Sequence, residues 1–385
     1  MSASVPIFRT AWAEEDIDAM SAVVRRGTFW TEGEEVLQFE QGLCATTARR
    51  FAVTFCNGTE ALFALLSALG IGRGDEVIVP SFTFIATANA PLFVDATPVF
   101  ADIEEQTLGL DPADVAARVT PRTKAIIPIN YGGQAAQVDT LEALAHERGI
   151  PLLEDTAETL GTTLGERRCG SFGTASLLSF CANKVISTAE GGAIVTDDGA
   201  LADRLRLVRS HGRELGRSYF TTAAQLDYIT LGHNLRMSSI TAALGLSQLR
   251  RLSANVAARQ RVAARYAADL SDLPQLQLPQ AGPKRSHCYQ LYSLRVRTPP
   301  APARRDALSA HLSAAGIGNK VYFPPVHLTS HFRSRTVGPT PTLPVTQRVS
   351  AEVLALPIFP GLTSEEQESV SAAVRAGVEQ FDGEG

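Results

Sequence analysis

Two residues of this sequence, Lys184 and Asp155, have the types and the placement to support chemistry at an amine. Lys184 lies in SFCANKVISTAEGG, a turn region between two apolar runs. A primary amine there can form an imine with an aldehyde and then carry a proton between reacting atoms. Asp155 ends the apolar run PLLED, at the carboxyl end of a predicted strand, where open α/β sheets bind ligands. A carboxylate there could keep a pyridine nitrogen protonated, so that the ring accepts electrons.

Each of these residues also has a purely structural explanation. A lysine in a loop is usually a solvated surface residue. Asp155 and Glu158, in EDTAET, could instead cap a helix that follows the strand.

A phosphate site is the second feature that the residue pattern predicts. The segment CNGTEAL, residues 56–62, follows a strand and opens a helix, where free backbone N–H groups and the helix dipole favour a phosphate dianion. Gly58 allows close approach, and Thr59 and Ser179 add hydroxyl groups. The alternative is that Asn57 is an N-cap whose capping box is closed by Glu60.

An aromatic residue that could stack on a pyridine ring occurs in VPSFTFIATANA, residues 79–90. Phe84 and Phe82 are the two candidates. Taken alone, such a phenylalanine is more often part of a core.

The elements that must position these residues alternate between strands and helices from about residue 51 to about 210. This alternation predicts an α/β fold, with a mostly parallel sheet between helical layers. A helix is expected from Asn57 to Leu69, ending at Gly70. The predicted strands are FAVTF, EVIVP, TPVFA, KAIIPI, PLLED, ASLLSF and GGAIVT.

The carboxyl-terminal part reads as a smaller α+β unit. A long Ala/Arg-rich helix is predicted over 254–270, and YQLYSLRV reads as a strand. Two more helices are expected over 303–316 and 363–381, the second opened by a capping box, and 331–345 has the composition of a surface loop. We expect a large domain over 1–250 and a small domain over 251–385. Whether the N-terminal segment packs with the small domain is left open.

Composition narrows the class of partner. The formal net charge is −5 and no long basic run is present, which argues against nucleic acid and anionic membranes and favours a small molecule. The sequence has neither a long uninterrupted apolar stretch nor a secretory signal pattern, so we expect a cytoplasmic protein. The five cysteines are scattered and form no CxxC pair, which predicts neither a disulfide framework nor a metal site.

Taken together, these segments resemble the sugar aminotransferases of the DegT/DnrJ/EryC1/StrS family, within the aspartate aminotransferase superfamily of fold type I. The resemblance covers nearly the whole chain. The segments that carry it include VLQFEQGLCATTARRFAVTFCNGTEAL, GRGDEVIVPSFTFIATANAPLFVDATPVFADI, EDTAETLG, SFCANKVISTAEGG, GHNLRMSSITAALGLSQL and YFPPVH.

The resemblance implies pyridoxal 5'-phosphate as cofactor and gives each cofactor residue a role. Lys184 would be the Schiff-base lysine, Asp155 the partner of the pyridine nitrogen and Phe84 the stacking aromatic residue. Phosphate contacts would come from Gly58, Thr59 and Ser179. Glu158 stands where the family usually has a glutamine that contacts the phenolic oxygen of the cofactor. Asn234 would reach the phosphate of the neighbouring subunit, which implies a homodimer with two shared active sites.

The substrate residues implied by the resemblance are Arg236, Lys320, Tyr322 and His327, in segments where the family binds a nucleotide-linked sugar. His327 could equally be a loop histidine without a ligand.

The expected function is transfer of the amino group of an amino acid, L-glutamate first, to a keto carbon of a nucleotide-linked deoxysugar. Three alternatives remain at this point: transamination of a keto-cyclitol or another secondary-metabolite ketone, sugar 3-dehydration, and a non-catalytic regulatory protein that binds the cofactor. Lys184 argues against the dehydration, because those enzymes have a histidine in its place.

Overall fold

The central sheet has seven strands and is mostly parallel. The computed structural model describes residues 4–216, 220–223, 225–335 and 340–381. Backbone pairing, with single bridges from β4 to β5, gives the strand order β1-β9-β8-β5-β4-β2-β3, in which β9 is antiparallel to both of its neighbours. All seven strands predicted from the sequence are present: β1 Phe51–Phe55, β2 Glu76–Pro80, β3 Thr97–Ala101, β4 Thr123–Ile126, β5 Leu153–Asp155, β8 Ala175–Ser179 and β9 Gly192–Thr196.

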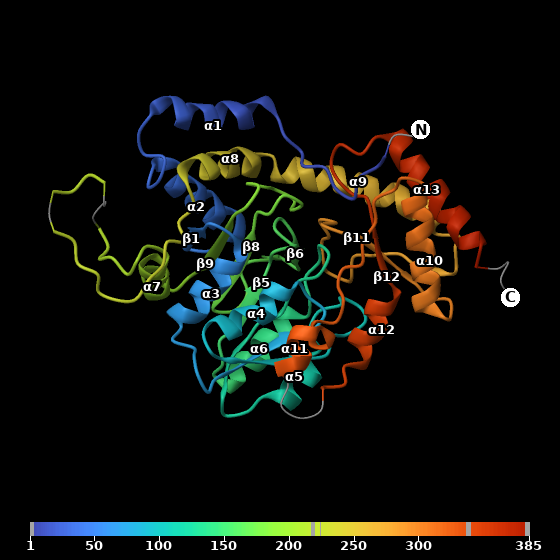
Figure 1. Ribbon diagram of the computed structural model, residues 1–385, viewed down its shortest axis with the longest axis horizontal. Coiled ribbons are helices and arrows are strands. Elements are labelled where there is room, and N and C mark those ends of the chain that lie inside the picture. The colour runs from blue at the N-terminus through green and yellow to red at the C-terminus, as the bar shows by residue number, and fades with distance from the viewer. Residues whose placement is uncertain (1–3, 217–219, 224, 336–339, 382–385) are drawn as a thin grey trace.

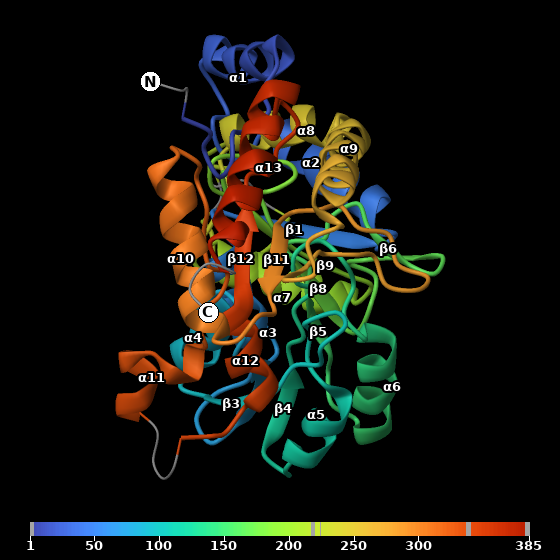
Figure 2. The ribbon, with the colours of Figure 1, turned by 90° about the vertical axis from the view of Figure 1, so that its right-hand side faces the viewer.

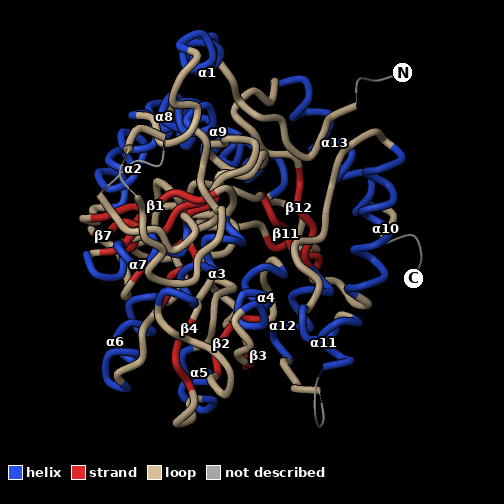
Figure 3. The backbone as a smooth tube through the Cα atoms, turned by 60° about the vertical axis from the view of Figure 1, so that its left-hand side comes forward, coloured by secondary structure: helices blue, strands red, loops and turns tan. Residues whose placement is uncertain are grey.

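Helices cover both faces of this sheet (Figures 1 and 3). Strands β2 and β9 are wholly buried, which explains their continuous apolar composition. A small hairpin, β6 Thr163–Leu164 and β7 Arg167–Arg168, follows β5. The helices up to residue 250 are α1 Glu14–Arg26, α2 Glu34–Thr47, α3 Gly58–Ala68, α4 Ile85–Phe93, α5 Pro112–Arg118, α6 Val138–Arg148, α7 Gly199–Arg209 and α8 Ser239–Arg250.

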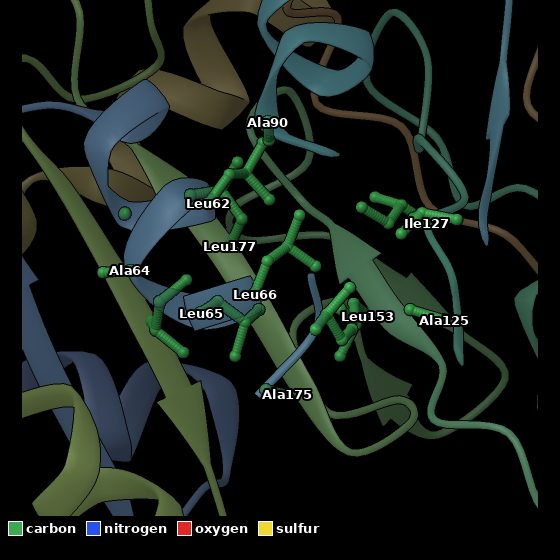
Figure 4. Close-up of a cluster of buried hydrophobic side chains, with 14 of the residues drawn as sticks. Leu62, Ala64, Leu65, Leu66, Ala90, Ala125, Ile127, Leu153, Ala175 and Leu177 are labelled. Atoms are coloured by element: carbon green, nitrogen blue, oxygen red, sulfur yellow. The ribbon is translucent and has the colours of Figure 1, made fainter. Parts of the chain in front are cut away.

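Helix α3 is anchored to the sheet by an apolar cluster. Leu62, Leu65 and Leu66 project from α3 toward Leu177 of β8 and Leu153 of β5 (Figure 4). All five side chains are buried, and each contributes on the order of 1.5–3 kcal/mol relative to an exposed position. This packing fixes the start of α3 beside the carboxyl ends of β5 and β8, where the candidate site lies.

A second, smaller sheet lies beside the first and has a core of its own (Figure 2). Its three antiparallel strands are β10 Leu276–Gln277, β11 Tyr292–Val296 and β12 Val353–Leu356. The helices of this part are α9 Leu252–Leu270, α10 Ala301–Ala314 and α13 Ser364–Glu379. The Thr363 and Glu366 capping box predicted for the last helix is present. The residue at which one domain ends and the next begins stays a prediction.

The prediction of a surface loop over 331–345 is wrong in part. Residues Ser330–Arg335 form α11, which follows the short 3-10 helix η1 Val326–Leu328, and Pro344–Glu352 form α12. Phe332 explains the first helix, because its buried ring packs edge-on against Phe100 with ring centroids 5.2 Å apart. Residues 336–339 of the predicted loop lie outside the described residues.

The N-terminal helix α1 lies along α8 at the outside of the molecule (Figure 1). Asp16 of α1 is buried there, accepts a hydrogen bond from the side chain of Gln248 at 2.7 Å and pairs with Arg251. Among the described residues, no helix has the length and hydropathy needed to cross a bilayer.

Candidate active site

A cavity of about 660 Å³ opens where the carboxyl ends of β5 and β8 meet the start of α3. It brings together nine of the residues that the sequence singled out. Seven are predicted cofactor residues and two are predicted substrate residues: Gly58, Thr59, Phe84, Asp155, Glu158, Ser179, Lys184, Lys320 and Tyr322.

Asp155 lies buried at the end of β5 and is held at both carboxylate oxygens. Its Oδ2 accepts from Thr87 Oγ1 at 3.0 Å, and its Oδ1 accepts from the backbone N–H of Ala157 at 3.1 Å. Burial raises the pKa of Asp155 to about 6, although both hydrogen bonds oppose the shift. A protonated pyridine ring facing this carboxylate would supply the positive charge that the buried anion lacks. The site therefore fits the cofactor role expected of Asp155.

Lys184 extends into the same cavity and meets Glu158. Its side chain is 14% exposed, and Nζ lies 3.5 Å from Glu158 Oε1. The other Glu158 oxygen accepts a hydrogen bond from the backbone N–H of Gly132 at 2.8 Å. This second bond fixes the carboxylate, so Glu158 in turn orients the amine of Lys184.

The start of α3 forms a cradle suited to a phosphate group. Asn57 caps the helix, because its Oδ1 accepts from the backbone N–H of Glu60 at 2.8 Å. The N–H groups of Gly58 and Thr59 lie in the first turn, where no intrahelical acceptor exists. A Cβ atom on Gly192 would come within 2.6 Å of the Asn57 carbonyl and the Gly58 nitrogen. The Asn57 cap therefore leaves the N–H groups of Gly58 and Thr59 available to an anion, and the absence of a side chain at Gly192 of β9 allows the start of α3 to pack against the sheet.

The two candidate stacking residues lie in different surroundings. Phe84 caps α4, is 58% exposed and lines the cavity. Phe82 is fully buried, with its ring centroid 4.8 Å from that of Tyr131. The position of Phe84 suits it to cover a ring in the cavity, whereas Phe82 belongs to the core.

Three of the residues implied by the resemblance lie outside this cavity. Asn234 is exposed on the segment before α8, where its backbone forms a bridge with Ser210. Arg236 lines a separate cavity of about 170 Å³, donates to Ser210 Oγ at 3.1 Å, and burial lowers the pKa of its guanidinium. His327 is 1% exposed, with Nδ1 2.6 Å from Ser81 Oγ. On this single chain, neither Arg236 nor His327 faces the cofactor cavity.

Sequence reasoning missed several residues of the site. The sequence pattern assigns no role to Thr87, although it lies three positions after Phe84, in the first turn of α4, and lines the same cavity. The backbone of Gly132 has no sequence signal at all for its contact with Glu158. Cys181, Asn183 and Glu190 also line the cavity, close to Lys184 in the sequence.

Comparison with known proteins agrees with this geometry. A family model described as the DegT/DnrJ/EryC1/StrS aminotransferase family matches residues 11–375. The chain is similar to the aminotransferase TlmJ from Streptoalloteichus hindustanus, with 30% sequence identity over 98% of this chain and 100% of that chain, and a TM-score of 0.90. It is similar to DesV from S. venezuelae, with 34% identity over 98% and 99% and a TM-score of 0.89.

A third similar structure is Helicobacter pylori PseC, an aminotransferase involved in the biosynthesis of pseudoaminic acid. It has 27% identity over 98% of this chain and 100% of that chain, and a TM-score of 0.91. These likenesses confirm the predicted fold, the type I arrangement of a large α/β/α domain and a smaller α+β domain.

Proposed function

Because this chain belongs to the DegT/DnrJ/EryC1/StrS aminotransferase family, whose enzymes use pyridoxal 5'-phosphate, we propose that it aminates a keto carbon of a nucleotide-linked deoxysugar. L-Glutamate is the proposed amino donor. The observation that carries this proposal is the convergence of Lys184, Asp155 and the α3 cradle in one cavity.

Different residues of the chain would hold the cofactor and move a proton. Gly58, Thr59 and Ser179 would bind its phosphate, and Phe84 would cover its ring. Asp155, held by Thr87 and Ala157, would pair with its pyridine nitrogen. When bound, pyridoxal 5'-phosphate supplies an electron sink for the carbon next to the transferred nitrogen. The Nζ atom of Lys184 would hold the cofactor covalently between turnovers and act as base and acid at that carbon.

Lys320 and Tyr322 support a sugar substrate at the mouth of the cavity. Lys320 Nζ lies 5.0 Å from the centre of the Tyr322 ring, and both residues line the cavity. An ammonium group beside an aromatic face suits a phosphorylated sugar, because the cation can pair with phosphate while the ring covers a sugar face.

The charge of the cavity supports an active site completed by a second subunit. Its described lining carries four carboxylates, from Glu60, Asp155, Glu158 and Glu190, but only two ammonium groups, from Lys184 and Lys320. A cofactor phosphate and a nucleotide diphosphate would both bring negative charge to this acidic lining. We propose that a homodimer supplies the missing donors, with Asn234 reaching the phosphate of the partner's cofactor and Arg236 reaching its substrate.

Exposed apolar side chains in the first 30 residues and in the segment before α8 fit such a dimer. Six large ones are between about half and four-fifths exposed, which is typical of a surface that another chain covers. They are Trp12, Phe29, Trp30, Phe220, Ile229 and Leu231.

The first experiment records the visible spectrum of the purified protein before and after addition of L-glutamate, with Lys184→Ala as the comparison. Wild type should show the visible band of the lysine-bound cofactor and lose it with glutamate, whereas Lys184→Ala should not show that conversion. Keto sugars linked to different nucleotides and an inosose are then offered to the aminated enzyme, with the mass of the product as readout. Aminated inosose alone would favour the cyclitol reaction over the sugar reaction.

A further inference from the structure

A second cavity lies on the far side of one wall of the active site. Its volume is about 770 Å³, and it runs along β11, so we call it the β11 groove. The groove is lined by segments that follow β3 and β4 and by residues 271–297. Its size is within the range of small-molecule sites. Its lining includes Glu105, Tyr131, Gly132, Gln134, His287, Ser293, Arg295 and Arg297.

The wall between the two cavities is the pair Tyr131 and Gly132. The Tyr131 hydroxyl oxygen lies 2.9 Å from Ser293 Oγ, in the groove, and 2.6 Å from the carbonyl oxygen of Tyr322, which lines the active site. Gly132 lines the groove, yet its N–H holds Glu158, the carboxylate next to Lys184. A ligand that pressed on this wall would therefore act on residues of the active site.

The groove contains a buried histidine with one nitrogen left for a ligand. His287 is 5% exposed, its ring stacks on Tyr289 at 4.0 Å, and its Nδ1 accepts from the backbone N–H of Tyr289 at 2.9 Å. Burial lowers the pKa of His287 to about 3, so the ring is neutral at pH 7. A neutral imidazole whose Nδ1 accepts carries its proton on Nε2. Among the described residues, this Nε2–H has no acceptor.

Gln134 offers a second donor beside it. The residue is 7% exposed, and its Oε1 accepts from the backbone N–H of Gly282 at 3.1 Å. Because this bond uses only Oε1, the amide NH₂ group of Gln134 can donate to a ligand in the groove. The Nε2–H of His287 and the NH₂ group of Gln134 are thus two donors whose neighbouring acceptor atoms are already bonded. A ligand oxygen that accepts hydrogen bonds would suit both.

The other end of the groove is cationic. Leu291, Ser293, Arg295 and Arg297 alternate along β11 and so share one face of the strand. Within the part of the chain that the structure describes, three guanidinium groups, from Arg295, Arg297 and Arg348, pair with two carboxylates, from Glu105 and Glu352. Arg297 bonds to these acids through Nη1, while its Nη2 has no acceptor among the described residues.

We propose that the β11 groove is an effector site for a small anionic polyol, whose oxyanion pairs with Arg297 and whose far end accepts from His287 and Gln134. Ser293 and Arg297 are four residues apart along the strand, which is roughly 13 Å between their Cα atoms, so a ligand that reaches from the Arg297 guanidinium past Ser293 is an extended molecule. The oxyanion is a phosphate or a carboxylate. Binding of the ligand shifts the wall formed by Tyr131 and Gly132 and thereby changes the position of the Glu158 carboxylate beside Lys184.

The test is isothermal titration calorimetry on the cofactor-loaded enzyme with three probes of similar length: ribose 5-phosphate, gluconate and sorbitol. Ribose 5-phosphate and gluconate separate a phosphate from a carboxylate, and neutral sorbitol shows whether the charge is needed. Saturable binding of at least one anion, without binding of sorbitol, is expected. The visible absorbance of the bound cofactor should change over the same concentration range.

Variants locate the binding. Arg297→Gln should weaken it about tenfold or more, as loss of one charge-assisted hydrogen bond does. Gln134→Glu should weaken it as well, because it keeps the acceptor for Gly282 but replaces the donor with a carboxylate. Exposed Arg335, which lies on α11, gives the matched control Arg335→Gln, and Lys320→Gln alters the active cavity instead. Neither control should change the affinity of the anion.

The proposal is overturned if no anion binds saturably, or if Arg297→Gln and Gln134→Glu bind it as tightly as wild type. It is also overturned if Lys320→Gln abolishes the binding, since the anion would then occupy the active site. These results are read from heats of binding, so they are independent of whether the enzyme aminates a nucleotide-linked sugar.

Discussion

The hydroxyl of Thr87 lies 3.0 Å from Oδ2 of Asp155, and behind it Thr83 Oγ1 lies 3.0 Å from Thr87 Oγ1. All three side chains are buried. With Oδ1 bound to the backbone N–H of Ala157, the carboxylate plane cannot rotate freely. Thr87 is thus a positioning residue for the group that would meet the pyridine nitrogen.

Replacing Thr87 with valine should weaken the cofactor site while the fold persists. Valine keeps the shape but leaves one Asp155 oxygen unbonded, and loss of a hydrogen bond to a charged group costs about 1.5–3 kcal/mol. We expect the dissociation constant of the cofactor to rise about tenfold in Thr87→Val, as measured by fluorescence titration of the apoenzyme.

Thr87→Ser is the matched control, because it keeps the hydroxyl and loses only a methyl group. Its cofactor affinity should stay near that of wild type. Equal weakening in both variants would assign the effect to packing around α4 rather than to the bond with Asp155.

The buried charge of Asp155 should make the apoenzyme less stable as the pH rises. Its pKa is about 6 in the folded protein and 3.8 in the reference state, so between these values the folded state keeps a proton that the unfolded state has lost. Stability therefore falls from about pH 4 to about pH 6 and then stays lower, by on the order of 2–3 kcal/mol at most.

Asp155→Asn removes this penalty, since asparagine keeps an acceptor for Ala157 and carries no charge. The melting temperature of Asp155→Asn apoenzyme should equal that of wild type near pH 4 and exceed it by a few degrees at pH 7. Cofactor should reverse the order by stabilising the wild type more. If the melting temperatures of the two apoenzymes differ by the same amount from pH 4 to pH 7, the pH dependence does not come from Asp155.

Local sequence patterns could predict much of the candidate site, because several of its residues lie where local elements begin or end. Asp155 ends a buried strand, and Gly58 and Thr59 open a helix directly after another. The apolar runs determine the strands, and parallel strands bring their carboxyl ends to one edge of the sheet. The placement of Lys184 near Asp155 follows from the pairing of β5 with β8, which precedes the lysine.

Contacts between distant segments could not be predicted in this way. The bond from Gly132 to Glu158 depends on how the loop after β4 packs, and no residue type signals it. His327 is polar and follows two prolines closely, which suggests a surface loop. The residue is nevertheless buried, and its Nδ1 forms a hydrogen bond with the side chain of Ser81. Asn234 and Arg236 depend on a second subunit for their proposed roles, so a single chain gives no geometry for them.

Gly192 should be intolerant of even a methyl group. A Cβ atom there would lie 2.6 Å from the backbone of Asn57 and Gly58 and would push the start of α3 off β9. We expect Gly192→Ala to lose cofactor affinity by at least tenfold, as measured by equilibrium dialysis. Gly361→Ala is the matched control, because a Cβ atom at Gly361 meets nothing within 4 Å. If both variants bind the cofactor normally, the α3 cradle does not hold its phosphate.

Mixing two inactive variants tests whether the active sites are shared. Lys184→Ala removes the amine inside the cavity, and Asn234→Ala removes a side chain proposed to reach the partner's cofactor. Because the backbone of Asn234 forms the bridge with Ser210, the second change leaves that bridge in place. Each pure variant should have little activity, but a heterodimer of the two contains one site with both residues intact.

Random exchange of subunits gives heterodimers as about half of all dimers, so the mixture should recover roughly a quarter of the wild-type activity. The measurement is the transamination rate after the variants are unfolded together and refolded, against the same treatment of each alone. A mixture no more active than the sum of its parts would show that Asn234 serves the cavity of its own chain or none. In that case the donors that balance Glu60 and Glu190 must come from elsewhere.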